Sequence, residues 1–267
     1  QCAKSIRSFK CASTTLSNSA KNKNIFHARQ THGQPERKIF SFFASTKFMH
    51  QVIILLGKSG SGKGTQAELL AKKFGFSHVV SGDLLRNRAK KSDFTGKKLS
   101  DVLAHGGLAP TGVIFKLWLD KIEGLKNSKN FKGAVLDGNP RKIKEAYLID
   151  EVFDWYEWKN VKAVLIDISD SEASVRLGKR RICQNKKCGN IIPYIDEYKD
   201  IKKCPKCGGK LVFRGDDNPE SVKKRLFWFT TEVQSIVDYY EKVGKLVKIN
   251  GEQPIEEVFQ DILKVLK

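Results

Sequence analysis

Residues 51–76 read QVIILLGKSGSGKGTQAELLAKKFGF and combine three kinds of segment. The first six residues are mostly apolar and predict a buried strand, and the residues from Lys63 onward have the pattern of an amphipathic helix. Between them, Gly57, Gly62 and Lys63 fit the G-x4-G-K pattern of a phosphate-binding loop. Backbone N–H groups must surround a bound phosphate, and a Cβ would block that approach. The stretch therefore predicts a nucleoside triphosphate site at a helix N-terminus.

Length and composition leave several classes open. A chain of 267 residues with 40% hydrophobic residues can form one α/β domain with insertions, or two small domains. No apolar run approaches the ~20 residues of a membrane span, so we expect a soluble, cytoplasmic protein. The formal net charge of +20 fits polyanionic substrates, nucleic acid or simple solubility, and the charge does not choose among them.

Residues 1–48 differ in composition from the rest of the chain. They contain nine Lys or Arg and one acidic residue, Glu36, and are rich in Ser, Thr and Asn. We expect this segment to be a disordered extension outside the fold. It has the composition of a mitochondrial or plastid transit peptide. Met49 is the sole methionine, and a translated upstream sequence before a true start at Met49 is the slightly favoured alternative.

The remainder of the chain alternates between strand and helix patterns. This alternation predicts an α/β fold, with a parallel sheet covered by helices on both faces. The expected strands are 51–56, 77–80, 134–136, 161–168 and 246–249. The expected helices begin at 63 and 84, after a turn at 81–83, and then span 94–104, 111–125, 143–158, 172–181, 219–243 and 255–266. Two segments, 81–110 and 182–214, are expected to be insertions in this fold.

The second insertion contains four cysteines with the spacing C-x4-C-x15-C-x2-C. They are Cys183, Cys188, Cys204 and Cys207. Four thiolates suit tetrahedral zinc, and a segment this short has too small a core to fold without such support. Free thiols or two disulfides are the alternatives, of which disulfides do not suit a cytosolic enzyme. We expect a structural zinc site.

A zinc ribbon also occurs in nucleic-acid-binding proteins, which makes a nucleic-acid-dependent ATPase the rival hypothesis. The insertion has lysines near its cysteines, among them Lys186, Lys187, Lys202, Lys203 and Lys206. Only Tyr194 and Tyr198 could stack on bases, and several exposed aromatics are typical of such a surface. Nucleic acid is therefore not the expected partner.

Five motifs in order resemble the adenylate kinase family. They are GKSGSGKGTQ, SGDLLR, LDGNPR, RLGKRR and FRGDDNPESVKKRL. The resemblance covers about residues 51–267, and the cysteines fall where zinc-bearing members carry their lid. It implies a five-stranded parallel sheet in a core of residues 49–80, 111–181 and 215–267, a monophosphate-binding insert at 81–110 and a lid at 182–214. It also implies reversible phosphoryl transfer from Mg·ATP to AMP, giving two ADP, in a monomeric enzyme.

The resemblance implies roles for individual residues. The expected ATP-binding residues are Gly60, Ser61, Gly62, Lys63, Gly64, Thr65, Arg176, Arg180 and Gln253. The expected AMP-binding residues are Ser81, Gly82, Arg86, Gly138, Arg141, Glu145, Arg214 and Arg225. The expected catalytic residues are Lys63, Arg86, Arg141, Arg180, Arg214 and Arg225. Asp137 is expected to hold Mg²⁺ through water, and Asp216 and Asp217 to anchor the lid.

One departure from the family pattern concerns the acceptor base. The family carries a glutamine for adenine where this chain has Glu145. A carboxylate only accepts hydrogen bonds, which suits the two adjacent donors of guanine. AMP is the expected acceptor, and GMP or another nucleoside monophosphate is the alternative.

Overall fold

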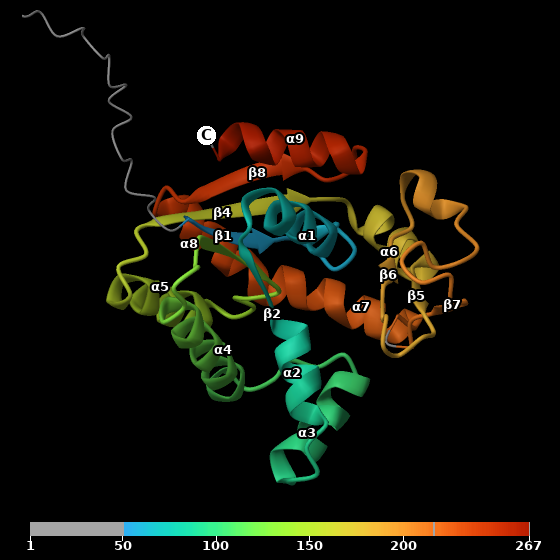
Figure 1. The fold of residues 1–267 in the computed structure, drawn as a ribbon, viewed down its shortest axis with the longest axis horizontal. Coiled ribbons are helices and arrows are strands. Elements are labelled where there is room, and N and C mark those ends of the chain that lie inside the picture. The colour runs from blue at the N-terminus through green and yellow to red at the C-terminus, as the bar shows by residue number, and fades with distance from the viewer. Residues whose placement is uncertain (1–50, 216, 267) are drawn as a thin grey trace, which may run out of the picture. The chain divides into compact units, whose positions relative to one another are not determined.

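The computed structural model describes residues 51–215 and 217–266. Five strands form a parallel sheet in the order β2-β3-β1-β4-β8 (Figure 1). The strands are β1 (Gln51–Leu56), β2 (Ser77–Val80), β3 (Gly133–Asp137), β4 (Asn160–Asp167) and β8 (Leu246–Asn250). The predicted α/β fold with a five-stranded parallel sheet is confirmed.

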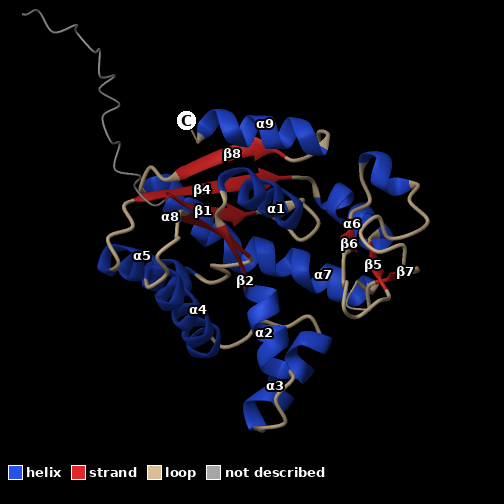
Figure 2. Ribbon diagram, in the orientation of Figure 1, coloured by secondary structure: helices blue, strands red, loops and turns tan. Residues whose placement is uncertain are grey.

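Helices cover both faces of this sheet, as Figures 1 and 2 show. The helices are α1 (Lys63–Phe74), α2 (Ser81–Ala89), α3 (Phe94–Ala104), α4 (Thr111–Lys126), α5 (Ile143–Trp155), α6 (Asp170–Lys179), α7 (Pro219–Trp228), α8 (Gln234–Lys242) and α9 (Ile255–Val265). A second, antiparallel sheet of order β6-β5-β7 consists of β5 (Arg181–Cys183), β6 (Ile191–Ile192) and β7 (Leu211–Phe213). A short 3-10 helix, Asp196–Lys199, lies between β6 and β7.

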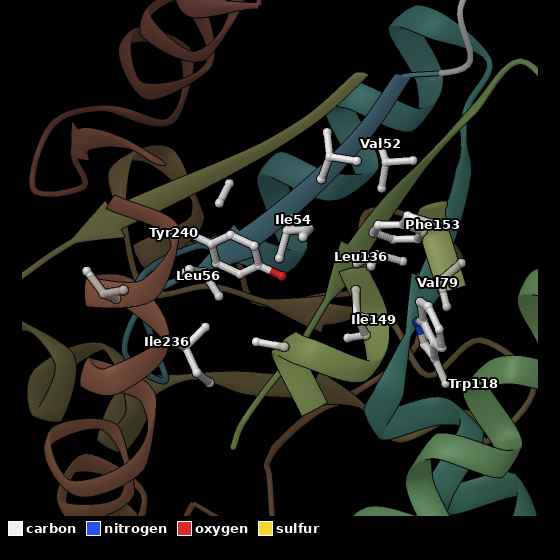
Figure 3. Packing of buried hydrophobic residues seen from close by; sticks show 14 of the residues in the cluster. Val52, Ile54, Leu56, Val79, Trp118, Leu136, Ile149, Phe153, Ile236 and Tyr240 are labelled. Carbon is white, nitrogen blue, oxygen red and sulfur yellow. The ribbon is translucent and has the colours of Figure 1, made fainter. Parts of the chain in front are cut away.

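Alternate residues of β1 pack on opposite faces of the large sheet, because successive strand side chains point in opposite directions. Val52, Ile54 and Leu56 join a core with α4, α5 and α8, which includes Trp118 and Tyr240 (Figure 3). Ile53 and Leu55 join a second core with α1 and α9. Because both faces are buried, the strand is apolar throughout rather than alternating, and its carboxyl end is held rigidly at the phosphate loop.

Several expected element boundaries differ from those in the structure. Residues 81–83 begin α2 instead of forming a turn. Helix α5 ends at Trp155, because Tyr156 and Glu157 turn the chain so that Trp158 is buried in the core. Helix α6 spans Asp170–Lys179 instead of 172–181, and Arg181 begins β5.

The expected helix 219–243 is also not continuous. A π-helical turn, Phe229–Val233, separates α7 from α8. Such a turn shifts the helical face that follows it. Phe229 and Val233 both pack against the core on this side of the sheet. The interruption therefore lies where this helical segment packs against the core.

The expectations for residues 1–48, for Met49 and for Asp216 concern positions outside the described residues. Among the residues that the structure describes, no helix is long and apolar enough to cross a membrane.

Candidate active site

The phosphate loop links the carboxyl end of β1 to α1, as predicted. Gly57, Gly60 and Gly62 all have positive φ, at 142°, 89° and 96°. A Cβ on Gly57 would lie 2.4 Å from the carbonyl oxygen of Ile166, so this position requires glycine. The loop backbone therefore passes close to β4 and can direct its N–H groups into the space above α1.

Lys63, the first residue of α1, turns its side chain back over this loop. Its Nζ donates to the carbonyl oxygens of Gly57 and Lys58, each at 2.7 Å. The pKa of Lys63 is lowered to about 8, mainly by burial of the ammonium group. The negative charge of Asp137 opposes this shift, and the positive charges of Arg141 and Arg180 add to it. This ammonium group is held by carbonyl oxygens that an incoming phosphate can replace.

A cavity of about 320 Å³ opens over the phosphate loop. Every residue that we expected to bind nucleotide lines it, together with Asp137, which we expected to hold Mg²⁺ through water. They are Gly60, Ser61, Gly62, Lys63, Gly64, Thr65, Ser81, Gly82, Arg86, Asp137, Gly138, Arg141, Glu145, Arg176, Arg180, Arg214, Arg225 and Gln253. The structure therefore brings together positions that are up to 193 residues apart in sequence, from Gly60 to Gln253.

Two of the cavity arginines share one buried carboxylate. Asp217 accepts hydrogen bonds from Arg180 Nε and Nη2, both at 2.7 Å, and from Arg225 Nη2 at 2.6 Å. Its side chain is 3% exposed. Burial raises the pKa of Asp217, but the two guanidinium groups outweigh burial and hold the pKa below its usual value. Asp217 therefore stays ionised and fixes both guanidinium groups. Arg176 is held separately, by Glu172 Oε1 at 2.6 Å from its Nε.

The turn after β3 places Asp137 and Arg141 at the cavity wall. Arg141 Nε donates to the carbonyl oxygen of Gly138 at 3.0 Å, and the Asn139–Pro140 peptide is cis. The Asp137 carboxylate lies 3.7 Å from His78 Nε2. Burial raises the pKa of Asp137, but His78 and Lys63 outweigh it and keep this pKa below its usual value. The carboxyl edge of the sheet thus presents the Asp137 carboxylate as an anionic oxygen ligand, near the positive charge of Lys63.

Glu145, in the first turn of α5, is nearly buried at 3% exposure. Its Oε2 accepts a hydrogen bond from the backbone N–H of Arg141 at 2.8 Å. Burial raises the pKa of Glu145 above its usual value, although this hydrogen bond opposes the rise. Glu145 therefore supports the backbone of Arg141 and also contributes to the cavity lining.

The four cysteines meet at one end of the small antiparallel sheet. Their Sγ atoms all lie within 4.8 Å of one another, with Cys183 and Cys207 at 3.4 Å and Cys188 and Cys204 at 3.7 Å. These distances far exceed the ~2.05 Å of a disulfide bond, and the four thiols are free. Four convergent sulfur ligands are suited to a tetrahedral metal ion.

Comparison with known proteins agrees with this geometry. The family model described as "Adenylate kinase" matches residues 55–245. The chain belongs to the adenylate kinase family. An adenylate kinase of Chlamydia muridarum is 35% identical in an alignment of 224 residues that covers 80% of this chain and 86% of that protein. Adenylate kinases of Caldicellulosiruptor bescii and Methanothrix thermoacetophila are 37% and 36% identical, over 80% of this chain and 98% and 97% of theirs.

The sequence prediction of an adenylate kinase, an ATP:AMP phosphotransferase, is thereby confirmed. Several other residues that line the cavity are not predicted from the sequence, because their residue types are common in any core. Leu85, Leu103 and Ile114 line it from the insertion 81–110 and from α4, and Tyr194 and Ile195 line it from the second insertion. The i, i+4 spacing of Glu172 and Arg176 was a usable signal for that ion pair.

Proposed function

We propose that the cavity of this adenylate kinase binds Mg·ATP and AMP together and aligns them for direct, in-line phosphoryl transfer. The observation that carries the proposal is the convergence of Lys63, Arg141, Arg180 and Arg225 on the cavity above the phosphate loop. Phosphoryl transfer needs little covalent chemistry from the protein, and depends on alignment and on neutralisation of charge. An oxygen of the acceptor phosphate attacks the terminal phosphorus of ATP, and the bond to the bridging oxygen breaks, leaving ADP.

The donor side of the site is assigned to the phosphate loop and α6. The backbone N–H groups of residues 60–65 would bind the phosphates of ATP at the N-terminus of α1. Lys63 would leave its carbonyl partners and follow the transferring phosphoryl group, together with Arg180 and Arg225. Arg176 and Gln253 would border the donor base, which their place in the cavity lining supports.

The acceptor side is assigned to α2 and to the turn after β3. Ser81 is buried, and its hydroxyl has no hydrogen-bond partner among the described residues. Arg86 is half exposed and paired with Asp83 at 2.6 Å, so it can exchange this partner for a phosphate. With Gly82, Gly138 and Arg214, Arg86 and Arg141 would bind and align the acceptor phosphate.

Two metal ions are part of the proposal. Mg²⁺ bound with ATP neutralises phosphate charge, and the ionised carboxylate of Asp137 fits a role in holding its waters, because oxygen ligands suit this ion. Zn²⁺ fits the four thiols Cys183, Cys188, Cys204 and Cys207, which form a complete tetrahedral ligand set among the described residues. The zinc would be structural, and would stabilise an insertion with little apolar core of its own.

We further propose the expected division of the chain into three functional parts. The insertion 81–110 would bind the monophosphate, the insertion 182–214 would be the lid, and the remaining described residues would be the core. The antiparallel sheet and cysteine cluster within 182–214 support the assignment of the lid. A monomeric enzyme is proposed, as the family resemblance implies. A cytoplasmic location is proposed, with a mitochondrial or plastid one if residues 1–48 act as a transit peptide.

The position of Glu145 supports a second candidate function, in which the enzyme accepts nucleoside monophosphates with a broader choice of base. One carboxyl oxygen is used by the backbone of Arg141, which leaves Oε1 to face a base. As a carboxylate, this oxygen would accept from guanine, and when protonated it could donate to adenine. Glu145→Gln would raise kcat/KM for AMP relative to GMP if Glu145 faces the base, and would leave the ratio unchanged if it does not.

Product analysis tests the proposed function directly. ATP and AMP mixed with enzyme and Mg²⁺ should give two ADP without any polynucleotide. Formation of ADP only after addition of DNA or RNA would overturn the kinase assignment in favour of the nucleic-acid-dependent ATPase. Parallel reactions with GMP, CMP and UMP measure the acceptor range.

A further inference from the structure

The side chain of Asp196, in the insertion 182–214, contacts the core at the start of α9. Asp196 Oδ2 accepts a hydrogen bond from the backbone N–H of Ile255 at 2.9 Å. Ile255 is the first residue of α9, and the residue before it, Pro254, provides no side-chain cap. The first N–H groups of a helix lack intrahelical partners and favour a negative charge. Asp196 therefore caps a core helix from a distance of 59 residues in sequence.

The backbone of Asp196 is held in an unusual conformation to make this contact. Its φ is +47°, a left-handed value that few residues other than glycine, asparagine and aspartate adopt. The next part of the segment is fixed by Arg181, whose guanidinium group donates to the carbonyl oxygens of Tyr198, Lys199 and Ile201 at 2.6 to 3.1 Å. Strained residues persist where the surrounding structure over-determines them. Arg181 thus shapes the turn that directs Asp196 toward α9.

The backbone of Ile255 links α9 to the insertion 182–214 and to α1. Its N–H donates to Asp196, and its carbonyl oxygen accepts from Gln66 Nε2 at 2.9 Å. Gln66 is 2% exposed and lies on α1, directly after the phosphate loop. Ile195, Gln66 and Ile255 also line the nucleotide cavity. The contact therefore lies next to residues that line the cavity, on the side of α1.

We propose that Asp196 is a positioning residue that holds the segment 182–214 closed on the core over the donor nucleotide. The proposal rests on the proposed function for the identity of that nucleotide, but the contact itself is independent of catalysis. When the hydrogen bond opens, the segment loses its attachment to α9, and ATP can leave. Asp196 acts through Ile255 and α9, and it is not assigned any contact with the reacting phosphates.

Amide hydrogen exchange tests the contact without any reaction. In Asp196→Ala, the Ile255 amide should exchange about tenfold faster or more than in the unaltered protein, since its acceptor is lost. Asp200→Ala is the matched control, because Asp200 is an exposed carboxylate four residues along the same segment. The amides of β1 and β4 in the same samples report whether the fold is intact. Equal exchange at Ile255 in all three proteins would overturn the proposal.

Steady-state kinetics then separate positioning from a general structural defect. Asp196→Ala should raise KM for ATP about three- to tenfold, as expected for loss of one charge-assisted hydrogen bond, and should leave KM for AMP unchanged. Asp196→Asn keeps an acceptor oxygen and tolerates the left-handed conformation, so it should restore most of the ATP affinity. Equal losses for both substrates, or equal effects of the alanine and asparagine variants, would contradict the assignment.

If the enzyme proved to transfer no phosphoryl group, the exchange experiment would still test the contact between Asp196 and Ile255 independently. A protected Ile255 amide that is released by Asp196→Ala would retain the contact and reject only the kinase assignment. An unprotected amide in an active kinase would reject the contact and retain the function.

Discussion

Arg180 and Asp217 are joined by two parallel hydrogen bonds, from Nε to Oδ2 and from Nη2 to Oδ1, each 2.7 Å long. This fork-like geometry fixes the plane of the guanidinium group as well as its position. Because Arg225 donates to the same carboxylate, one buried acid orients two of the cations over the phosphate loop. The positions of these two cations are therefore coupled.

Replacement of this acid is expected to damage catalysis more than substrate binding. Asp217→Asn keeps the shape but removes the charge, so both guanidinium groups lose their fixed orientation. We expect kcat to fall about 10- to 100-fold, as for loss of preorganised charge stabilisation, with a smaller change in KM for ATP. Asp200→Asn, an exposed carboxylate in the insertion, should leave kcat unchanged. A kcat within twofold of the unaltered enzyme would reject the coupling.

The pH dependence of ATP use should follow Lys63. Its pKa of about 8 in the free enzyme means that the ammonium group loses its proton as pH rises above 8. Since kcat/KM reports ionisations of free enzyme, kcat/KM for ATP should decline above about pH 8. Lys63→Arg keeps the charge at all these pH values, so its activity, although lower, should lack that decline. An identical alkaline limb in both proteins would assign the ionisation to another group.

The same shift has a predictable sign for stability. The folded state holds the proton on Lys63 less tightly than the unfolded chain, whose lysine pKa is near 10.5. Between about pH 8 and 10.5 the unfolded state therefore binds more protons, and this residue makes the free energy of unfolding rise with pH. Lys63→Met should remove that contribution, which urea unfolding at pH 7.5 and pH 9.5 can measure.

Metal removal should loosen the insertion 182–214 before the rest of the fold. Metal analysis is expected to find about one zinc per chain, bound by four thiolates. A chelator, or Cys204→Ser, should lower the thermal stability and increase amide exchange within 182–214, because metal binding is coupled to folding of such segments. Exchange in β1 and β4 should stay unchanged. Absence of zinc, with the same melting temperature in chelator, would contradict the zinc assignment.

A lysine in the phosphate loop should contribute to the stiffness of the loop. Lys58 Nζ donates to the carbonyl oxygen of Ile168 at 2.7 Å and pairs with Asp170 at 2.8 Å, which ties the loop to the start of α6. Lys58→Met should raise KM for ATP a few-fold and lower the free energy of unfolding by about 1 kcal/mol. Asp170→Asn should have a smaller effect on both, because Asp170 is 65% exposed and its pairing is screened by solvent.

Local sequence signals were sufficient for the sheet and for the phosphate loop, whereas the arginines expected to bind nucleotide followed from the resemblance to the adenylate kinase family. The apolar run of β1 ends at Gly57, and Asp137 ends a second buried strand, so both were expected at one edge of a parallel sheet. The cysteine spacing similarly indicated a convergent cluster. These features depend on residues that are close in sequence, or on the topology that alternating strands and helices impose.

Contacts between distant segments could not be predicted in the same way. The sequence around Asp196 does not indicate that Ile255 is its partner. Lys58 is a residue type that is usually solvated in loops, so its hydrogen bond to Ile168 could not be predicted either. The π-helical turn at Phe229–Val233 was hidden, because the flanking helices have ordinary periodicity and core packing decides where the extra residue is accommodated. Arg181 was assigned to a helix because its neighbours are helix formers, whereas pairing with β7 determines its strand conformation.

Phosphoryl transfer by Arg141→Ala is the measurement that tests the central claim most directly. Arg141 lines the cavity beside Gly138 and is assigned to the acceptor phosphate. We expect kcat/KM for AMP to fall about 10³-fold or more, the scale for removing a charge that stabilises a transferring phosphoryl group, while ATP still protects the phosphate loop from amide exchange. Arg88→Ala is the control, because Arg88 pairs with Asp93 outside the cavity and should retain activity. Conversion of ATP and AMP to ADP at an undiminished rate by Arg141→Ala would contradict the account.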